Sequence, residues 1–226
     1  MNALDNLKVK IYADGADRDG MLEMYAKPYI QGFTTNPTLM KKAGITDYKA
    51  FAHEILQAIP DRPISFEVFA DEFIDMERQA LEIKTWGENV YVKIPVSNTR
   101  QEMAYDLIAR LCGAGVHLNV TAILTLEQVQ NVADALKDGP DSIVSVFAGR
   151  IADTGLDPVP VMQEALTLLK VAPKAELLWA SPREVLNIYQ ADNIGCHIIT
   201  ATNDLIRKLA LGGKNLAEYS LETVQM

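Results

Sequence analysis

Short apolar runs alternate with longer amphipathic runs along the whole chain, and this alternation restricts the fold more than any other feature. The apolar runs are rich in Val, Ile and Leu, as is typical of parallel strands buried on both faces. The predicted strands are residues 9–14, 30–35, 64–69, 90–95, 117–122, 143–148, 176–181 and 196–201. The sequence therefore predicts a series of β-then-α units.

Amphipathic helices are predicted between these strands. Apolar residues recur at helical spacing in residues 71–86, 100–112, 125–137 and 158–171. Three helix starts are predicted from residues that suit an N-cap or a first turn, namely Thr99, Thr125 and Asp157-Pro158. Residues 214–226 are expected to form an extra helix. It would dock on its own barrel or on a neighbouring chain through Leu216, Tyr219 and Leu221.

The chain is expected to form a single domain over residues 1–226, with residues 214–226 as its helical tail. No break in composition and no linker rich in proline or glycine divides it. Eight β-then-α units close most simply into an α/β fold of the (β/α)8 TIM barrel type. An open doubly wound sheet is the alternative. It usually has a glycine-rich phosphate loop after its first strand, and Asp14-Gly15-Ala16-Asp17 lacks that pattern.

The composition argues against several classes of function. A net charge of -9 disfavours nucleic acid or an anionic membrane as the main partner. No apolar run is long enough to span a membrane, and residues 1–6 do not resemble a signal peptide, so we expect a cytoplasmic protein. Cys112 and Cys196 have no metal-binding spacing with the histidines, and we expect no metal ion.

Lys93 is the residue that points most directly to chemistry. In the run Val90–Pro95, the apolar Val90, Val92 and Ile94 share one face, which leaves Lys93 on the face that points into a barrel. Burial disfavours the ammonium form, and a neutral amine is a nucleophile for carbonyl carbon. A lysine that forms an ion pair or extends its amine into water is the alternative.

The same alternation directs a polar set into the barrel near the C-terminal ends of the strands. Its members are Asp14, Glu67, Lys93, Asn119, Thr121, Ser145 and Ser181. In the seventh strand, this assigns Trp179 and Ser181 to the inside and Leu178 and Ala180 to the outside. Barrel interiors are usually apolar, and barrel active sites lie at the C-terminal ends of the strands. The polar set therefore predicts an enzyme with its active site at that end.

Two arginines follow neighbouring strands at the same rim. Arg150 comes after the sixth strand, and Arg183 comes after the seventh, beside Ser181. Two guanidinium groups and a hydroxyl suit a phosphate monoester. For each arginine, an ion pair with Asp153 or Glu184 at a helix start is the alternative.

Three segments on their expected strands resemble the transaldolase family. They are Thr34-Thr35-Asn36-Pro37, Val92-Lys93-Ile94-Pro95 and Arg150-Ile151. Thr34-Thr35-Asn36-Pro37 alone is a common turn signal, whereas the three segments together are more specific to the family. The resemblance covers essentially the whole chain and is to the short branch of the family, which also contains fructose-6-phosphate aldolases. It implies a (β/α)8 barrel that acts on small sugar phosphates without a metal or organic cofactor. Whether the protein forms a homo-oligomer is left open.

The resemblance also implies a role for each position. Lys93 matches the lysine that forms the Schiff base, and Asp14 matches the carboxylate that moves the proton of the substrate C4 hydroxyl. Glu67 and Thr121 match the pair that holds the catalytic water. Asn36, Asn119 and Ser145 match groups that hold the dihydroxyacetone part, and Arg150, Ser181 and Arg183 match the phosphate cradle. Thr34 and Phe147 are also expected to bind substrate.

Two positions separate the activities within the family. Fructose-6-phosphate aldolases typically have glutamine at the position of Glu67 and tyrosine at that of Phe147, so this chain resembles transaldolases. Phenylalanine has no hydroxyl to protonate an enamine and release dihydroxyacetone. The alternatives are an aldolase that releases dihydroxyacetone and a non-catalytic barrel that binds sugar phosphates. Trp179, Pro182 and Gly15 differ from the family pattern, which leaves an unusual sugar phosphate or a sulfonate open as substrate.

Overall fold

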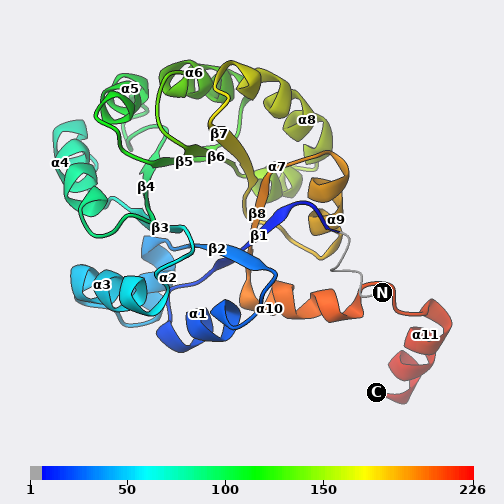
Figure 1. Cartoon of the computed structure of the whole chain (residues 1–226). Coiled ribbons are helices and arrows are strands. Elements are labelled where there is room, and N and C mark those ends of the chain that lie inside the picture. The colour runs from blue at the N-terminus through cyan, green and yellow to red at the C-terminus, as the bar shows by residue number, and fades with distance from the viewer. Residues whose placement is uncertain (1–6) are drawn as a thin grey trace.

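The computed structural model describes residues 7–226, in which eight parallel strands close into a barrel surrounded by helices (Figure 1). Each strand pairs with its neighbours in sequence, and the last pairs with the first. The strands are β1 (Lys10–Asp14), β2 (Ile30–Thr34), β3 (Ile64–Glu67), β4 (Val90–Pro95), β5 (Leu118–Ile123), β6 (Ser142–Val146), β7 (Ala175–Trp179) and β8 (Ile198–Thr202). The predicted (β/α)8 barrel is confirmed.

The α-helices lie outside the sheet, with extra helices after β2, β6 and β8. They are α1 (Arg18–Tyr25), α2 (Pro37–Lys42), α3 (Tyr48–Ala58), α4 (Phe73–Lys84), α5 (Tyr105–Gly113), α6 (Leu126–Leu136), α7 (Ala148–Asp153), α8 (Pro158–Leu168), α9 (Leu186–Asn193), α10 (Asn203–Arg207) and α11 (Leu216–Gln225). Two predicted helix starts are confirmed. Thr125 forms a capping box with Gln128, and Asp157 caps α8 with Pro158 in the first turn.

The predicted helix start at Thr99 is wrong, because α5 begins at Tyr105. The backbone N–H and hydroxyl of Thr99 instead donate to the Asp71 carboxylate, over 2.8 and 2.6 Å. The intervening loop is closed by an isolated bridge between Ser97 and Met103. A carboxylate that is distant in sequence therefore holds Thr99 in a loop that precedes the helix.

The orientation predicted for β7 is also wrong. Leu178 and Ala180 pack inside the barrel, whereas Trp179 is buried in the layer between the sheet and the helices. Both faces of this strand are apolar, so alternation of polarity could not decide which face points inward. Ser181 still reaches the rim because it follows the strand with a left-handed backbone, at φ 61°.

A packed interior forms the floor beneath the C-terminal end of the barrel. The ring of Tyr12 lies over Gly32, where an added Cβ would come within 2.5 Å of a ring carbon. Tyr12 also packs with apolar side chains from β6, β7 and β8, including Ile143 and Ile198. Above this floor lies the C-terminal end of the barrel, where barrel enzymes have their active sites.

The helix predicted in residues 214–226 is present as α11, which extends away from the barrel (Figure 1). It buries none of its residues, and the apolar Leu216, Tyr219 and Leu221 are exposed. The described chain therefore does not dock this helix on its own barrel, and docking on a neighbouring chain stays a prediction. No helix within residues 7–226 is long and apolar enough to cross a membrane.

Candidate active site

A cavity of about 670 Å³ opens at the C-terminal ends of the strands. It brings together ten of the twelve residues selected from the sequence. These are Asp14, Thr34, Asn36, Glu67, Lys93, Thr121, Ser145, Phe147, Arg150 and Ser181. Asn119 and Arg183 do not line the cavity. The polar side chains near the C-terminal ends of β1 to β6 thus surround one space.

Lys93 is 8% exposed, and its amine is held by two oxygen atoms. The Nζ atom donates to the backbone carbonyl of Thr35 over 3.1 Å and lies 3.1 Å from Oε2 of Glu67. The sequence left open whether this amine forms an ion pair or extends into water. In the structure it forms an ion pair with Glu67 and does not extend into water. A proton can pass between Lys93 and Glu67 over this distance, since it lies within hydrogen-bond reach.

Asp14 is held by the hydroxyl of Thr34, which donates to Oδ1 over 2.7 Å. Burial raises the pKa of Asp14 above its ordinary value of 3.8, and the charge of Lys93 and the hydrogen bond from Thr34 oppose this rise. A carboxylate with a raised pKa in a cavity can accept and return a proton more readily than one in water.

Thr121 is 3% exposed, and its hydroxyl has no hydrogen-bond partner among the described residues. A buried hydroxyl without a partner is costly, so a group inside the cavity is the natural partner for it. Ala122, the next residue, lines the same cavity with a left-handed backbone, at φ 62°. Ala122 and Ser181 are both non-glycine residues in this region, so the rim carries backbone strain at two strand ends.

Asn119 lies beneath the cavity and is fully buried. Its Oδ1 accepts a hydrogen bond from the Ser145 hydroxyl over 2.6 Å, and its Nδ2 donates to the Ser65 hydroxyl over 2.9 Å. Because the hydrogen of Ser145 is used in this contact, its lone pairs face the cavity as acceptors. Asn119 therefore acts on the cavity through Ser145, rather than as part of its wall.

Asn36 follows β2 and caps α2. Its Oδ1 accepts from the backbone N–H of Leu39 over 2.9 Å, so the side-chain carbonyl is used within the turn. The side-chain amide is the remaining hydrogen-bonding group that Asn36 can present to the cavity that it lines. Asn36 therefore has the structural role in the turn that its sequence context indicates. Its side-chain amide is also held at the rim of the cavity as a donor.

The two arginines predicted for a phosphate differ in their surroundings. Arg150 lines the cavity and has no ion pair among the described residues. Arg183 pairs with Asp153, with 2.8 Å between Nε and Oδ1, and its Nη1 donates over 2.9 Å to both the carbonyl and the hydroxyl of Ser181. The sequence left an ion pair with Asp153 as the alternative to phosphate binding, and the structure shows this ion pair for Arg183.

Gly149 allows the loops after β6 and β7 to approach each other. A Cβ at this position would lie 1.6 Å from the carbonyl oxygen of Ser181, a backbone atom that cannot swing away. The backbone N–H of Gly149 also donates to the carbonyl of Ala180 over 3.3 Å. Glycine is needed here for close packing, and this packing brings Arg150 and Ser181 to one end of the cavity.

Thr200 on β8 lines the cavity and was absent from the sequence-based set. Its Oγ1 lies 2.6 Å from Oγ1 of Thr34, and both residues are buried. The alternation of Ile198 and Thr200 on one face of the strand was the available signal. A single inward threonine is common as a satisfied core hydrogen bond, so this signal alone does not identify a site residue.

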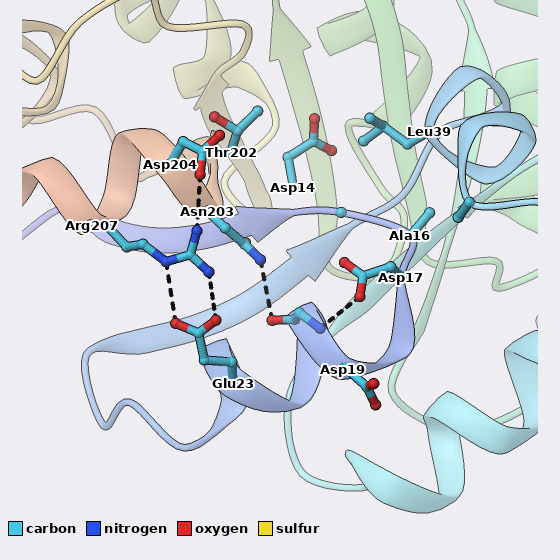
Figure 2. Close-up of a pocket in the computed structure, with 13 residues that line it drawn as sticks. Asp14, Ala16, Asp17, Asp19, Glu23, Leu39, Thr202, Asn203, Asp204 and Arg207 are labelled. Atoms are coloured by element: carbon cyan, nitrogen blue, oxygen red, sulfur yellow. Dashed lines mark hydrogen bonds and ion pairs between the residues drawn. The ribbon is translucent and has the colours of Figure 1, made fainter.

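A second hollow of about 630 Å³ lies beside the site and shares Asp14 and Leu39 with it. Figure 2 shows that Glu23 and Asp204 both contact Arg207 there, while Asp14 points away from them. Asp17 accepts from the backbone N–H of Gly20 over 2.8 Å and so caps α1. Glu23, Asp204 and Asp17 are thus used in contacts that stabilise the loops and helix ends around the hollow.

Known proteins resemble this chain over most of its length. Residues 11–225 match the family described as Transaldolase/Fructose-6-phosphate aldolase. A protein of Dehalococcoides mccartyi named "Probable transaldolase" is 30% identical over 202 residues, which cover 89% of this chain and 90% of that protein. A "Probable transaldolase" of Methanococcus maripaludis is 32% identical over 202 residues and covers 89% of each chain.

Solved structures share the barrel at lower sequence identity. A 2,3-dimethylmalate lyase has a TM-score of 0.59 and 15% identity, with 99% of this chain and 86% of that chain covered. A mandelate oxidase variant has the same TM-score of 0.59 at 13% identity, with 98% and 77% covered. At such identities the likeness concerns the fold alone. The family match and the sequence relatives, in contrast, show that the chain belongs to the transaldolase/fructose-6-phosphate aldolase family.

Proposed function

We propose that this protein is a transaldolase that transfers a dihydroxyacetone unit from a ketose phosphate to an aldose phosphate through a Schiff base on Lys93. Family membership supports the reaction class. The observation that carries the proposal is the buried amine of Lys93, which lies 3.1 Å from the Glu67 carboxylate inside a cavity that also contains Asp14 and Thr121. This set supplies a nucleophile, two proton-transfer groups and an unpartnered hydroxyl.

In the first half of the reaction, the neutral amine of Lys93 attacks the C2 carbonyl of fructose 6-phosphate or sedoheptulose 7-phosphate. The resulting carbinolamine loses its hydroxyl as water, with a proton that Glu67 delivers through a water molecule bound by Thr121. An iminium remains on Lys93. The unpartnered Thr121 hydroxyl supports this role, because it needs a hydrogen-bond partner in the cavity.

Carbon–carbon cleavage follows from the iminium. Asp14 removes the proton of the C4 hydroxyl, C4 becomes an aldehyde, and the electrons of the C3–C4 bond move into the iminium. The first aldose leaves, and a three-carbon enamine stays on Lys93. An acceptor aldehyde then reacts with this enamine, Asp14 returns the proton to the new hydroxyl, and water releases the product ketose. Such an activity belongs to the pentose phosphate pathway of carbohydrate metabolism.

The remaining residues of the cavity would hold the substrate. Arg150 and Ser181 lie at one end and suit the phosphate, so remote binding energy would orient the reacting carbons. Asn36 and Ser145 suit the hydroxyls of the dihydroxyacetone part. Asn119 would contribute by orienting Ser145, and Arg183 by holding Ser181.

The second candidate is a fructose-6-phosphate aldolase, which releases free dihydroxyacetone. Phe147 favours transfer, because it lines the cavity without a hydroxyl that could protonate the enamine. An assay of fructose 6-phosphate with and without an acceptor aldehyde separates the two activities, since only the aldolase turns over without an acceptor. A non-catalytic sugar-phosphate binder is the third candidate, and it would bind the phosphate ester without any turnover.

Borohydride reduction in the presence of fructose 6-phosphate tests the proposed intermediate. We expect a stable three-carbon adduct on Lys93, located by peptide mass spectrometry, in wild-type protein and none in Lys93→Met. Turnover by Lys93→Met, or active wild-type protein that is never labelled, would refute the mechanism.

A further inference from the structure

Three side chains from three adjacent strands form a chain of hydrogen bonds that ends on Asp14. Thr34 of β2 contacts Asp14 of β1 over 2.7 Å, and Thr200 of β8 contacts Thr34 over 2.6 Å. The strand β1 lies between the other two, so the chain passes over the inner face of the barrel. All three residues line the cavity.

The number of available hydrogens sets the direction of this chain. An ionised carboxylate can only accept, so Thr34 must donate its single hydroxyl hydrogen to Asp14. The contact between Thr34 and Thr200 then needs a hydrogen from Thr200. When Asp14 is ionised, the hydrogen bonds therefore run from Thr200 to Thr34 and from Thr34 to Oδ1 of Asp14.

The two oxygens of Asp14 are consequently unequal. Oδ1 is held by Thr34, while Oδ2 has no hydrogen-bond partner within the described part of the chain. The carboxylate can thus stay in one orientation and offer Oδ2 to a group in the cavity. While the hydrogen of Thr200 is used on Thr34, the Thr200 hydroxyl can only accept a hydrogen bond from a group in the cavity.

We propose that Thr200 is a positioning residue for the transaldolase reaction, which keeps the Thr34 hydroxyl pointed at Asp14 and leaves Oδ2 of Asp14 free to take the proton of the substrate C4 hydroxyl. This inference rests on the proposed function, in which Asp14 performs that proton transfer. It assigns a role to a residue on the eighth strand, which lies 166 positions from Thr34 in the sequence.

The electrostatic surroundings of Asp14 allow the effect of Thr200 to be separated from effects of charge. The charged groups around Asp14 are Lys93, Glu67 and Arg150 in the cavity, and Asp17, Asp19, Glu23, Asp204 and Arg207 around the adjacent hollow. Replacement of Thr200 by valine changes none of these charges and keeps the shape of the side chain. A change in the protonation of Asp14 would then report the lost hydrogen bond.

The test measures kcat, KM and the pH dependence of kcat in Thr200→Val. We expect kcat to fall about tenfold, because the proton acceptor is less well held, while KM stays within about twofold. The acidic limb of the profile should move up by about half a pH unit, since the ionised form of Asp14 loses support. Thr200→Ser, which keeps the hydroxyl, should restore both.

Two controls separate positioning from general stability. Ser142→Ala removes another buried hydroxyl, which donates to the Pro140 carbonyl at the opposite end of the barrel, and should leave kcat and the pH profile unchanged. Thermal unfolding of each variant checks that it is folded. If Thr200→Val does not fold, Thr200→Ala is compared with Thr200→Ser in the same assays.

The results that would overturn the role of Thr200 differ from those that would overturn the proposed function. Total borohydride labelling of Lys93 by fructose 6-phosphate, counted over the three-carbon and the intact six-carbon adducts, should persist in Thr200→Val, because formation of the Schiff base does not use Asp14. A wild-type pH profile in folded Thr200→Val, or a loss confined to KM, would overturn the role of Thr200. Failure of the wild-type protein to become labelled would instead overturn the proposed function.

Discussion

Lys93 and Glu67 face each other at the same level of the barrel, with 3.1 Å between Nζ and Oε2. They occupy paired register positions on β4 and β3, and both side chains point into the cavity. Their proximity therefore follows directly from parallel pairing of adjacent strands, in which residues in register share a face. A buried amine is thus provided with a proton-transfer partner by the architecture of the sheet.

Glu67→Gln should slow formation of the Schiff base. Glutamine keeps the size of the side chain but cannot deliver a proton, so we expect single-turnover labelling of Lys93 to slow by about 100-fold. The measurement is borohydride trapping of fructose 6-phosphate at timed intervals. Asp14→Asn is the matched control, which should be labelled at the wild-type rate but with the intact six-carbon sugar phosphate, because it fails to cleave the C3–C4 bond. Equal labelling rates in Glu67→Gln and wild type would exclude Glu67 from this step.

Arg150 and Arg183 should differ in their effect on a phosphorylated substrate. Arg150→Ala should raise KM for fructose 6-phosphate by about 10- to 100-fold, as expected for loss of a charge-assisted hydrogen bond. Arg183→Ala removes the partner of Asp153 and should have a smaller effect on KM, with a lower melting temperature. Steady-state kinetics and thermal unfolding measure both quantities. The assignment of Arg150 to the phosphate would be contradicted by an unchanged KM in Arg150→Ala.

Phe147→Tyr should shift the protein from transfer toward release. The added hydroxyl gives the enamine a proton donor, so acceptor-free formation of dihydroxyacetone should rise by about tenfold relative to transfer. An enzymatic assay for dihydroxyacetone, run with and without acceptor, gives this ratio. Phe147→Leu controls for changes in packing, since it adds no donor. An unchanged ratio in Phe147→Tyr would show that another feature prevents release.

Asp14→Asn should make the protein more stable at neutral pH while it abolishes turnover. Burial raises the pKa of Asp14 in the folded state above its ordinary value of 3.8. The unfolded chain therefore ionises first, and stability is lost as the pH rises from 3.8 through the raised pKa. Asparagine removes this loss, and the melting temperature at pH 7 should rise by about 2–4 °C for each kcal/mol recovered.

Thermal unfolding as a function of pH checks the sign of this effect. The advantage of Asp14→Asn should shrink as the pH falls below 3.8, where both states of the wild type are protonated. Asp153→Asn is the opposite control. The hydrogen bond and charge of Arg183 lower the pKa of Asp153, so this variant should lose stability at neutral pH and match the wild type in acid. A destabilised Asp14→Asn at pH 7 would contradict the account.

The sequence by itself determined the eight-unit barrel and the inward direction of Lys93. In the strand that carries Lys93, the apolar face is unambiguous, and a period of two then decides where the amine points. The same reasoning brought Asp14, Glu67 and Thr121 to one cavity. Local periodicity suffices for these residues because their neighbours in the chain define the buried face.

Only the tertiary structure decided the hydrogen-bond and ion-pair partners. Both faces of β7 are apolar, so alternation assigned Trp179 to the wrong side. Arg183 found Asp153, and Thr200 found Thr34 from a position 166 residues away. The physical reason is the short range of these contacts. Polarity along a strand specifies a face, but a hydrogen bond depends on which atoms the closed barrel brings within about 3 Å of each other.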